Sequence, residues 1–341
     1  IDKSELTSKE LEAKYALLMS MALDKNYIDL QSDSVIAPAV RYYENHGTPD
    51  ERLKMYYYSG RIKQNSGDNE GAMEMFVKGE SYGDECTDKA CLARLYKAKM
   101  AVNQDIFNYP QAIIDTWNAA DCYLAIGDMT RYYNSINDLA VLYNQTGNLD
   151  KSSECLNILK QNWDNLTVKH KGKYYAIAID ACQTSDEIQR LVNEYHADIN
   201  DSTLIQWLTL AYAYVRLDRP ELGLEMLDNA LIYNNYEKDA AYYFVLASAN
   251  ERLDNNIEAL AAYKNYMNIT DSLDLKIFDA DTKFIEERHR KEIELLDAEH
   301  SKERIMFISI IAILCAVIVI YLIRKQLQIR TAEKKQLEIE K

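Results

Sequence analysis

The sequence predicts an all-α protein: a right-handed superhelix of paired helices, then one long helix, one membrane crossing and the start of a coiled coil. Three observations lead to this fold class. Only 10 Gly and 4 Pro occur in the chain, so residues that break helices are scarce. Small and large apolar residues recur in windows of about 34 residues, a period typical of paired helices. An uncharged apolar run occupies residues 305–323.

The windows predict helical hairpins. Small residues stand at the eighth and twentieth positions of a window, and large residues at the fourth, seventh, eleventh and twenty-fourth. Such spacing lets two antiparallel helices approach closely while the large side chains fill the space between them. Turn residues such as Gly67 and Gly147 fall in the middle. The windows are 53–86, 133–166, 204–237 and 240–273.

Two windows depart from this pattern, because Lys63 replaces a large residue and Ser152 replaces an alanine. Other segments between the windows also have helical character. They are 88–107, 110–126, 170–182 and 185–197. We therefore expect about six or seven helical pairs within a repeat domain that covers residues 1–273.

A charged segment follows the repeats over residues 274–304. Its second part lacks Gly and Pro and has a thin apolar stripe, which predicts one long helix. Two interpretations stay open: a solvated stalk, or a signalling helix that passes movement or dimer spacing along its length. A homodimer formed through this helix and the C-terminal segment is expected.

The apolar run, residues 305–323, predicts a transmembrane helix. It would extend roughly 28 Å, about the thickness of the hydrocarbon core of a bilayer. A buried core helix is the alternative, but this run is apolar all round. The tail, 324–341, has six basic and three acidic residues, which favours a cytoplasmic tail with residues 1–304 outside. This predicts a single-pass inner-membrane protein; a tail-anchored cytosolic protein is the alternative.

Signatures of catalysis are absent from the sequence. It contains no Gly-rich phosphate loop, no HExxH and no Cys/His cluster with metal spacing, so we expect no enzyme activity, cofactor or metal. His289 could be considered as a phospho-acceptor. In the predicted topology, however, it lies outside the membrane, where ATP is absent, so we do not expect it to be catalytic. The net charge of −15 argues against binding to nucleic acid. Cys86 and Cys91 are expected as buried thiols, with a bridge between them left open.

The window 204–237 resembles the tetratricopeptide repeat family. The matching residues are Trp207, Leu210, Ala211, Tyr214, Gly223, Leu227 and Ala230. The N-terminal stretches 9–29 and 56–61 are similar to the exported single-pass tetratricopeptide sensors of Bacteroidetes-type bacteria. In that family a repeat ectodomain precedes one crossing, and a coiled coil leads to a kinase or DNA-binding output. The resemblance implies a signal-transducing receptor; a membrane-anchored scaffold or adaptor is the alternative.

The same resemblance implies a binding groove for a protein or peptide. In the family, certain positions of the first helix in each pair line a concave surface. In this chain those positions include Tyr57, Arg61, Asn65, Asn137, Asn144, Tyr212, Arg216 and Arg252. Amide and guanidinium groups bind peptide backbone or carboxylates, although the same residues could simply be solvated. The Lys/Asn clamp of members that bind chaperone tails is not reproduced intact, so that ligand is not expected.

Overall fold

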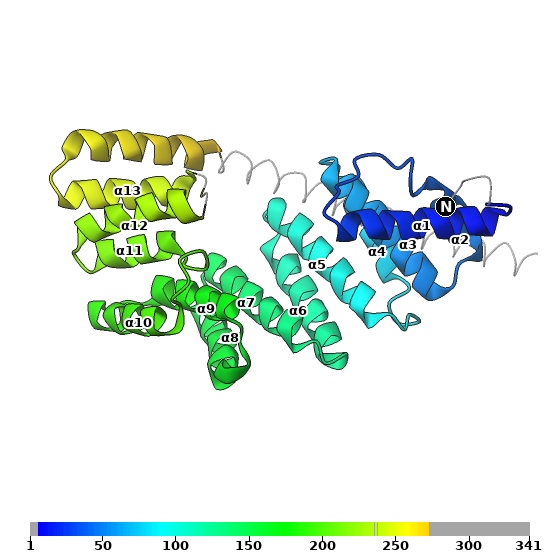
Figure 1. Ribbon diagram of the computed structural model, residues 1–341, viewed down its shortest axis with the longest axis horizontal. Coiled ribbons are helices and arrows are strands. Elements are labelled where there is room, and N and C mark those ends of the chain that lie inside the picture. The colour runs from blue at the N-terminus through cyan, green and yellow to red at the C-terminus, as the bar shows by residue number, and fades with distance from the viewer. Residues whose placement is uncertain (1–5, 235, 237, 273–341) are drawn as a thin grey trace, which may run out of the picture. The chain divides into compact units, whose positions relative to one another are not determined.

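All regular structure in the described part of the protein is helical (Figure 1). The computed structural model describes residues 6–234, 236 and 238–272. The α-helices are α1 (Lys9–Lys25), α2 (Ala37–His46), α3 (Pro49–Asn65), α4 (Asn69–Glu80), α5 (Lys89–Asp105), α6 (Tyr109–Ala125), α7 (Met129–Gln145), α8 (Leu149–Gln161), α9 (Val168–Ala181), α10 (Ser185–Asp198), α11 (Trp207–Arg216), α12 (Pro220–Tyr233), α13 (Ala240–Arg252) and a helix over 256–272. A short 3-10 helix, Trp163–Asn165, follows α8.

The predicted membrane crossing is not supported, and the fold class is corrected on this point. No helix in the described part of the chain is long and apolar enough to span a bilayer. Its helices are amphipathic and bury their apolar faces against neighbouring helices, so α5, for example, carries charges along its length. The segments 274–304, 305–323 and 324–341 lie outside the described residues. The predicted single-pass inner-membrane localisation depended on that crossing and is corrected with it.

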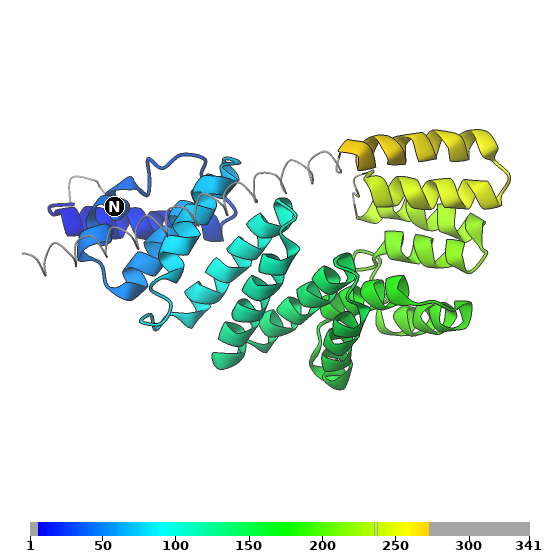
Figure 2. The same cartoon turned by 180° about the vertical axis from the view of Figure 1, so that it is seen from behind.

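Consecutive helices pair into hairpins, and each hairpin packs on the next (Figures 1 and 2). The odd-numbered helices also contact one another along the array, as α1 does with α3 and α9 does with α11. All described residues belong to one compact unit of the chain. The domain boundaries expected from the sequence stay predictions.

The hairpins around α3, α5 and α7 repeat at a constant interval, which is longer than the predicted window. Thr48, Asp88 and Asp128 are evenly spaced in the sequence and begin these three helices. Each side chain accepts a hydrogen bond from the backbone N–H three residues later. The window 53–86 therefore corresponds to α3–α4, and the window 133–166 corresponds to α7–α8. Neither window includes the hairpin between them. That hairpin is α5–α6, whose helices correspond to those predicted at 88–107 and 110–126.

A residue with positive φ closes most turns between these helices. Gly67, Gly127 and Gly147 have φ between +71° and +82°, where glycine avoids the steric cost of a Cβ. Phe107 takes the same place between α5 and α6 with φ of +59°. Because Phe107 has a Cβ, its left-handed backbone conformation costs about 1–2 kcal/mol.

Close packing inside the hairpins is confirmed at the predicted positions. A Cβ added to Gly60, the eighth position of its window, would lie 2.3 Å from Cε1 of Phe76, the twenty-fourth. A Cβ on Gly223, the twentieth position of another window, would lie 2.6 Å from Cγ2 of Val215. Both distances are far below van der Waals contact. The small residues therefore set how closely the two helices of a hairpin approach.

Candidate functional site on the odd-numbered helices

One row of equivalent residues runs along the odd-numbered helices. Six of these helices in the described part of the chain are followed by a turn residue with positive φ: Tyr27 after α1, and Gly67, Phe107, Gly147, Asp218 and Asp254 after α3, α5, α7, α11 and α13. Ten residues before the last five turn residues stand Tyr57, Lys97, Asn137, Leu208 and Phe244. Equivalent positions of stacked repeats share one face; here Tyr57 and Asn137 are buried, whereas Lys97 and Phe244 are partly exposed. We call this row, with the adjoining Arg94, Asp138, Lys173 and Tyr212, the odd-helix face.

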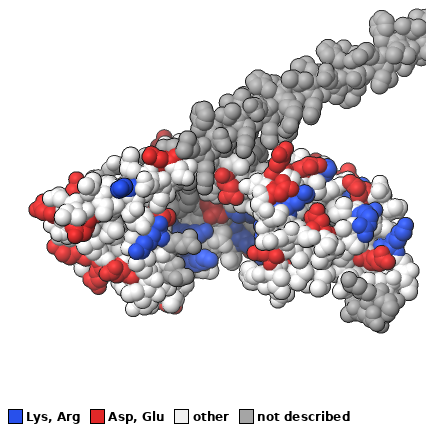
Figure 3. Space-filling model, turned by 90° about the horizontal axis from the view of Figure 1, so that it is seen from above, with Lys and Arg blue, Asp and Glu red and all other residues white. Residues whose placement is uncertain are grey.

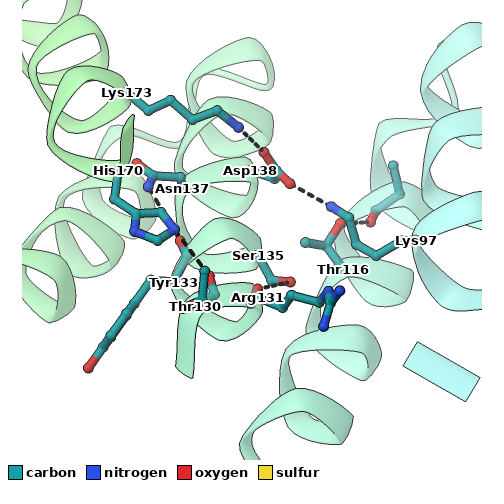
Figure 4. A network of polar contacts seen from close by, with 11 residues as sticks. Lys97, Thr116, Thr130, Arg131, Tyr133, Ser135, Asn137, Asp138, His170 and Lys173 are labelled. Carbon is teal, nitrogen blue, oxygen red and sulfur yellow. Dashed lines mark hydrogen bonds and ion pairs between the residues drawn. The ribbon is translucent and has the colours of Figure 1, made fainter. Parts of the chain in front are cut away.

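One carboxylate joins three successive hairpins on this face (Figure 4). Lys97 Nζ, from α5, lies 2.5 Å from Oδ2 of Asp138 on α7. Lys173 Nζ, from α9, lies 3.2 Å from Oδ1 of the same carboxylate. The exposed fractions of the three side chains are 23%, 26% and 35% for Lys97, Asp138 and Lys173. Two ammonium groups thus share one carboxylate, which leaves a net positive charge within reach of solvent.

Arg94 of α5 adds a second cationic group to the face. Its guanidinium carbon lies 5.8 Å from the centre of the Tyr57 ring, and its Nε is buried without a hydrogen-bond partner. Burial raises the pKa of Tyr57 well above its ordinary value, so the phenol stays neutral. No carboxylate in the described part of the chain forms an ion pair with Arg94. The guanidinium therefore lies against the Tyr57 ring, with the Cys91 thiol as a further neighbour and no carboxylate bound to it.

Two predicted groove residues, Asn137 and Asn144, lie two helical turns apart on α7. Asn137 is fully buried, and its Nδ2 donates to the carbonyl oxygen of Tyr133 at 3.3 Å. The Oδ1 atoms of both asparagines are buried and have no hydrogen-bond partner. An unpaired buried acceptor costs about 1–3 kcal/mol.

The other predicted residues of the first half lie on α3, and they connect it to α1 and the turn that follows it. Arg61 Nε lies 3.5 Å from Oδ1 of Asp24. Asn65 Nδ2 donates to Oδ1 of Asp29 at 3.3 Å. Tyr57, as described above, lies under Arg94.

Arg216 and Arg252, predicted for the groove, connect successive odd-numbered helices. Arg216 donates to the carbonyl oxygen of Ile179 at 2.9 Å and to that of Cys182, at the end of α9. Arg252 donates to the carbonyl oxygen of Val215, near the end of α11. A cation at the C-terminal end of a helix satisfies free carbonyl groups there. The charge of each arginine is thus engaged within the fold, and Arg216 also lies 5.3 Å from the Tyr212 ring centre.

The structure brings together residues that the sequence prediction missed. Arg94, Lys97 and Lys173 lie on helices that were predicted without a repeat register, so no groove position was assigned to them. An even spacing is the signal that could have found one of them, because Lys97 stands midway in the sequence between Tyr57 and Asn137.

A buried histidine fastens α9 to α7 close to this face (Figure 4). His170 is 1% exposed, and its Nδ1 accepts from the backbone N–H of Thr167 at 3.2 Å. Its Nε2 lies 3.1 Å from the carbonyl oxygen of Thr130. A neutral ring with its proton on Nε2 satisfies both contacts, whereas a proton on Nδ1 would break the first. Burial accordingly lowers the pKa of His170 below its ordinary value.

We expect this histidine to make the protein less stable in mild acid. An unfolded histidine has a pKa of about 6.5, so below that pH the unfolded state binds the proton first. Neutral His170 therefore contributes fully to the free energy of unfolding above a pH of about 6.5. This contribution is lost as the pH falls toward the lower pKa of His170 in the folded state. Urea unfolding at about pH 7.5 and about pH 5.5 measures the change. His170→Gln should flatten this dependence, whereas the exposed-site control His46→Gln should keep it; an unchanged slope in H170Q would contradict the assignment.

Metal and disulfide chemistry find no support in the described part of the chain. No group of three or more His, Cys, Asp or Glu residues there could hold a metal ion. Cys86 and Cys91 are both free thiols, so the possible bridge between them does not form. Burial raises the pKa of Cys91 to about 11, which keeps it protonated.

Comparison with known proteins places the fold. No family model matches the chain, and no curated protein matches its sequence. A solved tetratricopeptide repeat protein from Parabacteroides merdae matches with a TM-score of 0.53 and 12% identity, over 79% of this chain and 98% of that one. BtubC (BKLC) from P. vanneervenii matches with a TM-score of 0.36 and 14% identity, over 79% and 93%.

Stacked helical pairs form extended surfaces. The register of Gly60 against Phe76, the row of equivalent positions on α3, α5, α7, α11 and α13, and the Parabacteroides merdae match agree with one another. The chain is a helical-repeat protein with the tetratricopeptide repeat fold.

Proposed function

We propose that the odd-helix face binds an extended segment of another protein. The observation that supports this is the continuity of the face across hairpins, where Lys97, Asp138 and Lys173 join three of them. Packed helices lie about 8–10 Å apart, and an extended residue advances about 3.3–3.6 Å. Each step from one odd-numbered helix to the next therefore corresponds to about three residues of a bound segment.

We further propose that this binding is the input step of a signalling protein, as the resemblance to exported tetratricopeptide sensors implies. A scaffold would hold its partner without changing the rest of the array. A sensor must pass the bound state along the array toward the last described helix, 256–272. Hydrogen exchange in that helix should slow or quicken on binding if the protein is a sensor, and should stay unchanged if it is a scaffold.

The binding proposal predicts that a bulky residue on the odd-helix face blocks peptides. A displayed library of random peptides would be selected on the full chain. Ala101 lies one helical turn after Lys97 on the same side of α5, so Ala101→Trp should weaken the selected peptides at least about tenfold. Ile114→Trp is the matched control, because Ile114 is 51% exposed on the even-numbered α6.

Two results would contradict the proposal. The first is a selection that enriches no peptide. The second is a set of peptides that bind the A101W variant as tightly as the unchanged protein, which would move the binding surface away from the odd-numbered helices. Circular dichroism of both variants checks that each retains its helical content.

A further inference from the structure

We propose that the partner segment has two parts: an acidic part that lies across α5, α7 and α9, and an apolar part that lies across α11 and α13. The inference rests on the proposed function and adds the chemistry of the partner. It follows from a change in side-chain character along the odd-helix face, from cationic in the middle to apolar at the later helices.

The middle of the face is cationic although the chain is acidic. The chain carries 54 Asp and Glu against 39 Lys and Arg. On α5, α7 and α9, however, the face as defined above contains Arg94, Lys97 and Lys173 with one carboxylate, that of Asp138, and Asp180 is exposed two turns after Lys173 on α9. Figure 3 shows several Lys and Arg side chains, with Asp and Glu side chains beside them, in the middle of the view. The positive charge is therefore concentrated where the proposed segment would cross.

A carboxylate from the partner would satisfy groups that the fold leaves incomplete. Lys97 and Lys173 both use Asp138, and each ammonium can donate three hydrogen bonds. Arg94 is half-buried and forms no ion pair in the described part of the chain; because its Nε is buried, a partner carboxylate would bind the terminal nitrogens of the guanidinium. Arg94 and Lys97 are three residues apart on α5, so they lie on the same side of that helix. Two neighbouring acidic side chains of a partner suit this arrangement.

The same row becomes apolar on the next helices. Leu208 of α11 and Phe244 of α13 hold the places that Lys97 and Asn137 hold earlier. Phe244 is 37% exposed, and its ring centre lies 6.4 Å from that of Tyr212 and 5.6 Å from that of Tyr266. Arg216, a cation of α11, is engaged with the carbonyl groups of α9. An aliphatic or aromatic side chain suits this end of the face.

The packing gives the distance between the two parts. α9 contacts α11, and α11 contacts α13, so Lys173 and Phe244 lie on helices two steps apart. Two steps of about 8–10 Å correspond to about five or six extended residues.

A nucleic acid also carries regular negative charge, but it would gain nothing from the apolar end. The excess of acidic residues over the chain would also repel a long polyanion.

The test uses fluorescently labelled peptides and the full chain, with binding followed by anisotropy. One peptide carries four glutamates, a spacer of about five Gly and Ser residues, and a Leu-Phe pair. A second has these parts in the opposite order. A third replaces the glutamates with lysines, and a fourth replaces Leu-Phe with Ser-Ser. We expect one of the first two to bind at least about tenfold more tightly than the third and fourth, with an affinity that falls as salt rises.

Variants assign the binding to the two parts of the face. The double variant Lys97→Glu/Lys173→Glu should weaken the acidic peptide at least about tenfold, and Phe244→Ala should weaken it only when Leu-Phe is present. The matched control is Lys78→Glu/Lys151→Glu, which makes the same change of charge on the even-numbered α4 and α8. If the charge reversal unfolds the protein, Lys97→Gln/Lys173→Gln serves in its place and should also weaken binding.

Three results would overturn the inference: equal binding of the glutamate and lysine peptides, equal binding by the test and control double variants, or tighter binding of a single-stranded oligothymidylate than of either acidic peptide. Failure here differs from failure of the proposed function. If library peptides without acidic residues bind and lose binding in A101W, the face binds proteins but the stated chemistry is wrong. If no peptide binds at all, the proposed function fails as well.

Discussion

Replacing Lys99 with Met is expected to lower the free energy of unfolding by about 3–5 kcal/mol, because it leaves a buried carboxylate without its cation. Lys99 is 5% exposed, and its Nζ lies 2.9 Å from Oδ1 of Asp115 and 2.6 Å from Oε2 of Glu80. Asp115 is fully buried and accepts a further hydrogen bond from Asn103 Nδ2 at 2.8 Å. The cluster joins α4, α5 and α6, so its loss acts on two hairpins.

A second variant separates the loss of the pair from the loss of side-chain volume. In Lys99→Met/Asp115→Leu the buried carboxylate is gone, and Glu80, whose side chain is 31% exposed, remains in contact with water. The double variant should therefore recover most of the loss, since removing both charges of a buried pair is often nearly neutral. A double variant as unstable as Lys99→Met alone would show that packing, and not charge, controls the site.

The pH dependence gives an independent check on the same cluster. Burial raises the pKa of Asp115 even with Lys99 beside it. Without Lys99 the folded state should take up a proton more readily than the unfolded state does. The deficit of Lys99→Met should therefore shrink as the pH falls toward about 5, as measured by urea unfolding. A deficit that stays constant with pH would contradict a charged, unpaired Asp115.

The sequence was sufficient for features that depend on close contacts inside one hairpin. Gly60, Phe76 and Gly223 were placed correctly because the spacing of small and large residues directly reports which side chains face each other. Register between hairpins was harder to predict. The predicted window is shorter than the interval between α3, α5 and α7, so α5–α6 was found as two helices but not as a repeat.

The odd-helix face shows a second limit of sequence reasoning. Arg216 and Arg252 were assigned to a groove by position, yet each donates to a carbonyl group 37 residues earlier in the chain, on another helix. No local pattern identifies such a partner, because it depends on how hairpins stack. The same holds for Lys99 and Asp115, since a charged residue in a helical sequence is normally interpreted as solvated. Tertiary packing decides which polar residues are free to bind a partner.

Phe76→Ala is expected to destabilise the protein by about 3–5 kcal/mol, because it removes a ring that the opposite helix cannot replace. Phe76 of α4 is fully buried, and its ring lies directly over Gly60 of α3. Phe76→Ala would leave a cavity at this crossing, with Gly60 contributing no side chain to fill it. Urea unfolding measures the change, and a loss below about 1 kcal/mol would contradict this packing.

The crossing also predicts coupling between the two residues. Gly60→Ala alone should cost about 1–3 kcal/mol, because the new Cβ would overlap the Phe76 ring. Gly60→Ala in a Phe76→Leu background should cost clearly less, since the smaller and more flexible side chain can move aside. A coupling energy of about 1 kcal/mol or more in this double-mutant cycle is expected for residues in contact. Additive effects would mean that α3 and α4 separate readily, and the spacing of small and large residues would then not control how closely they approach.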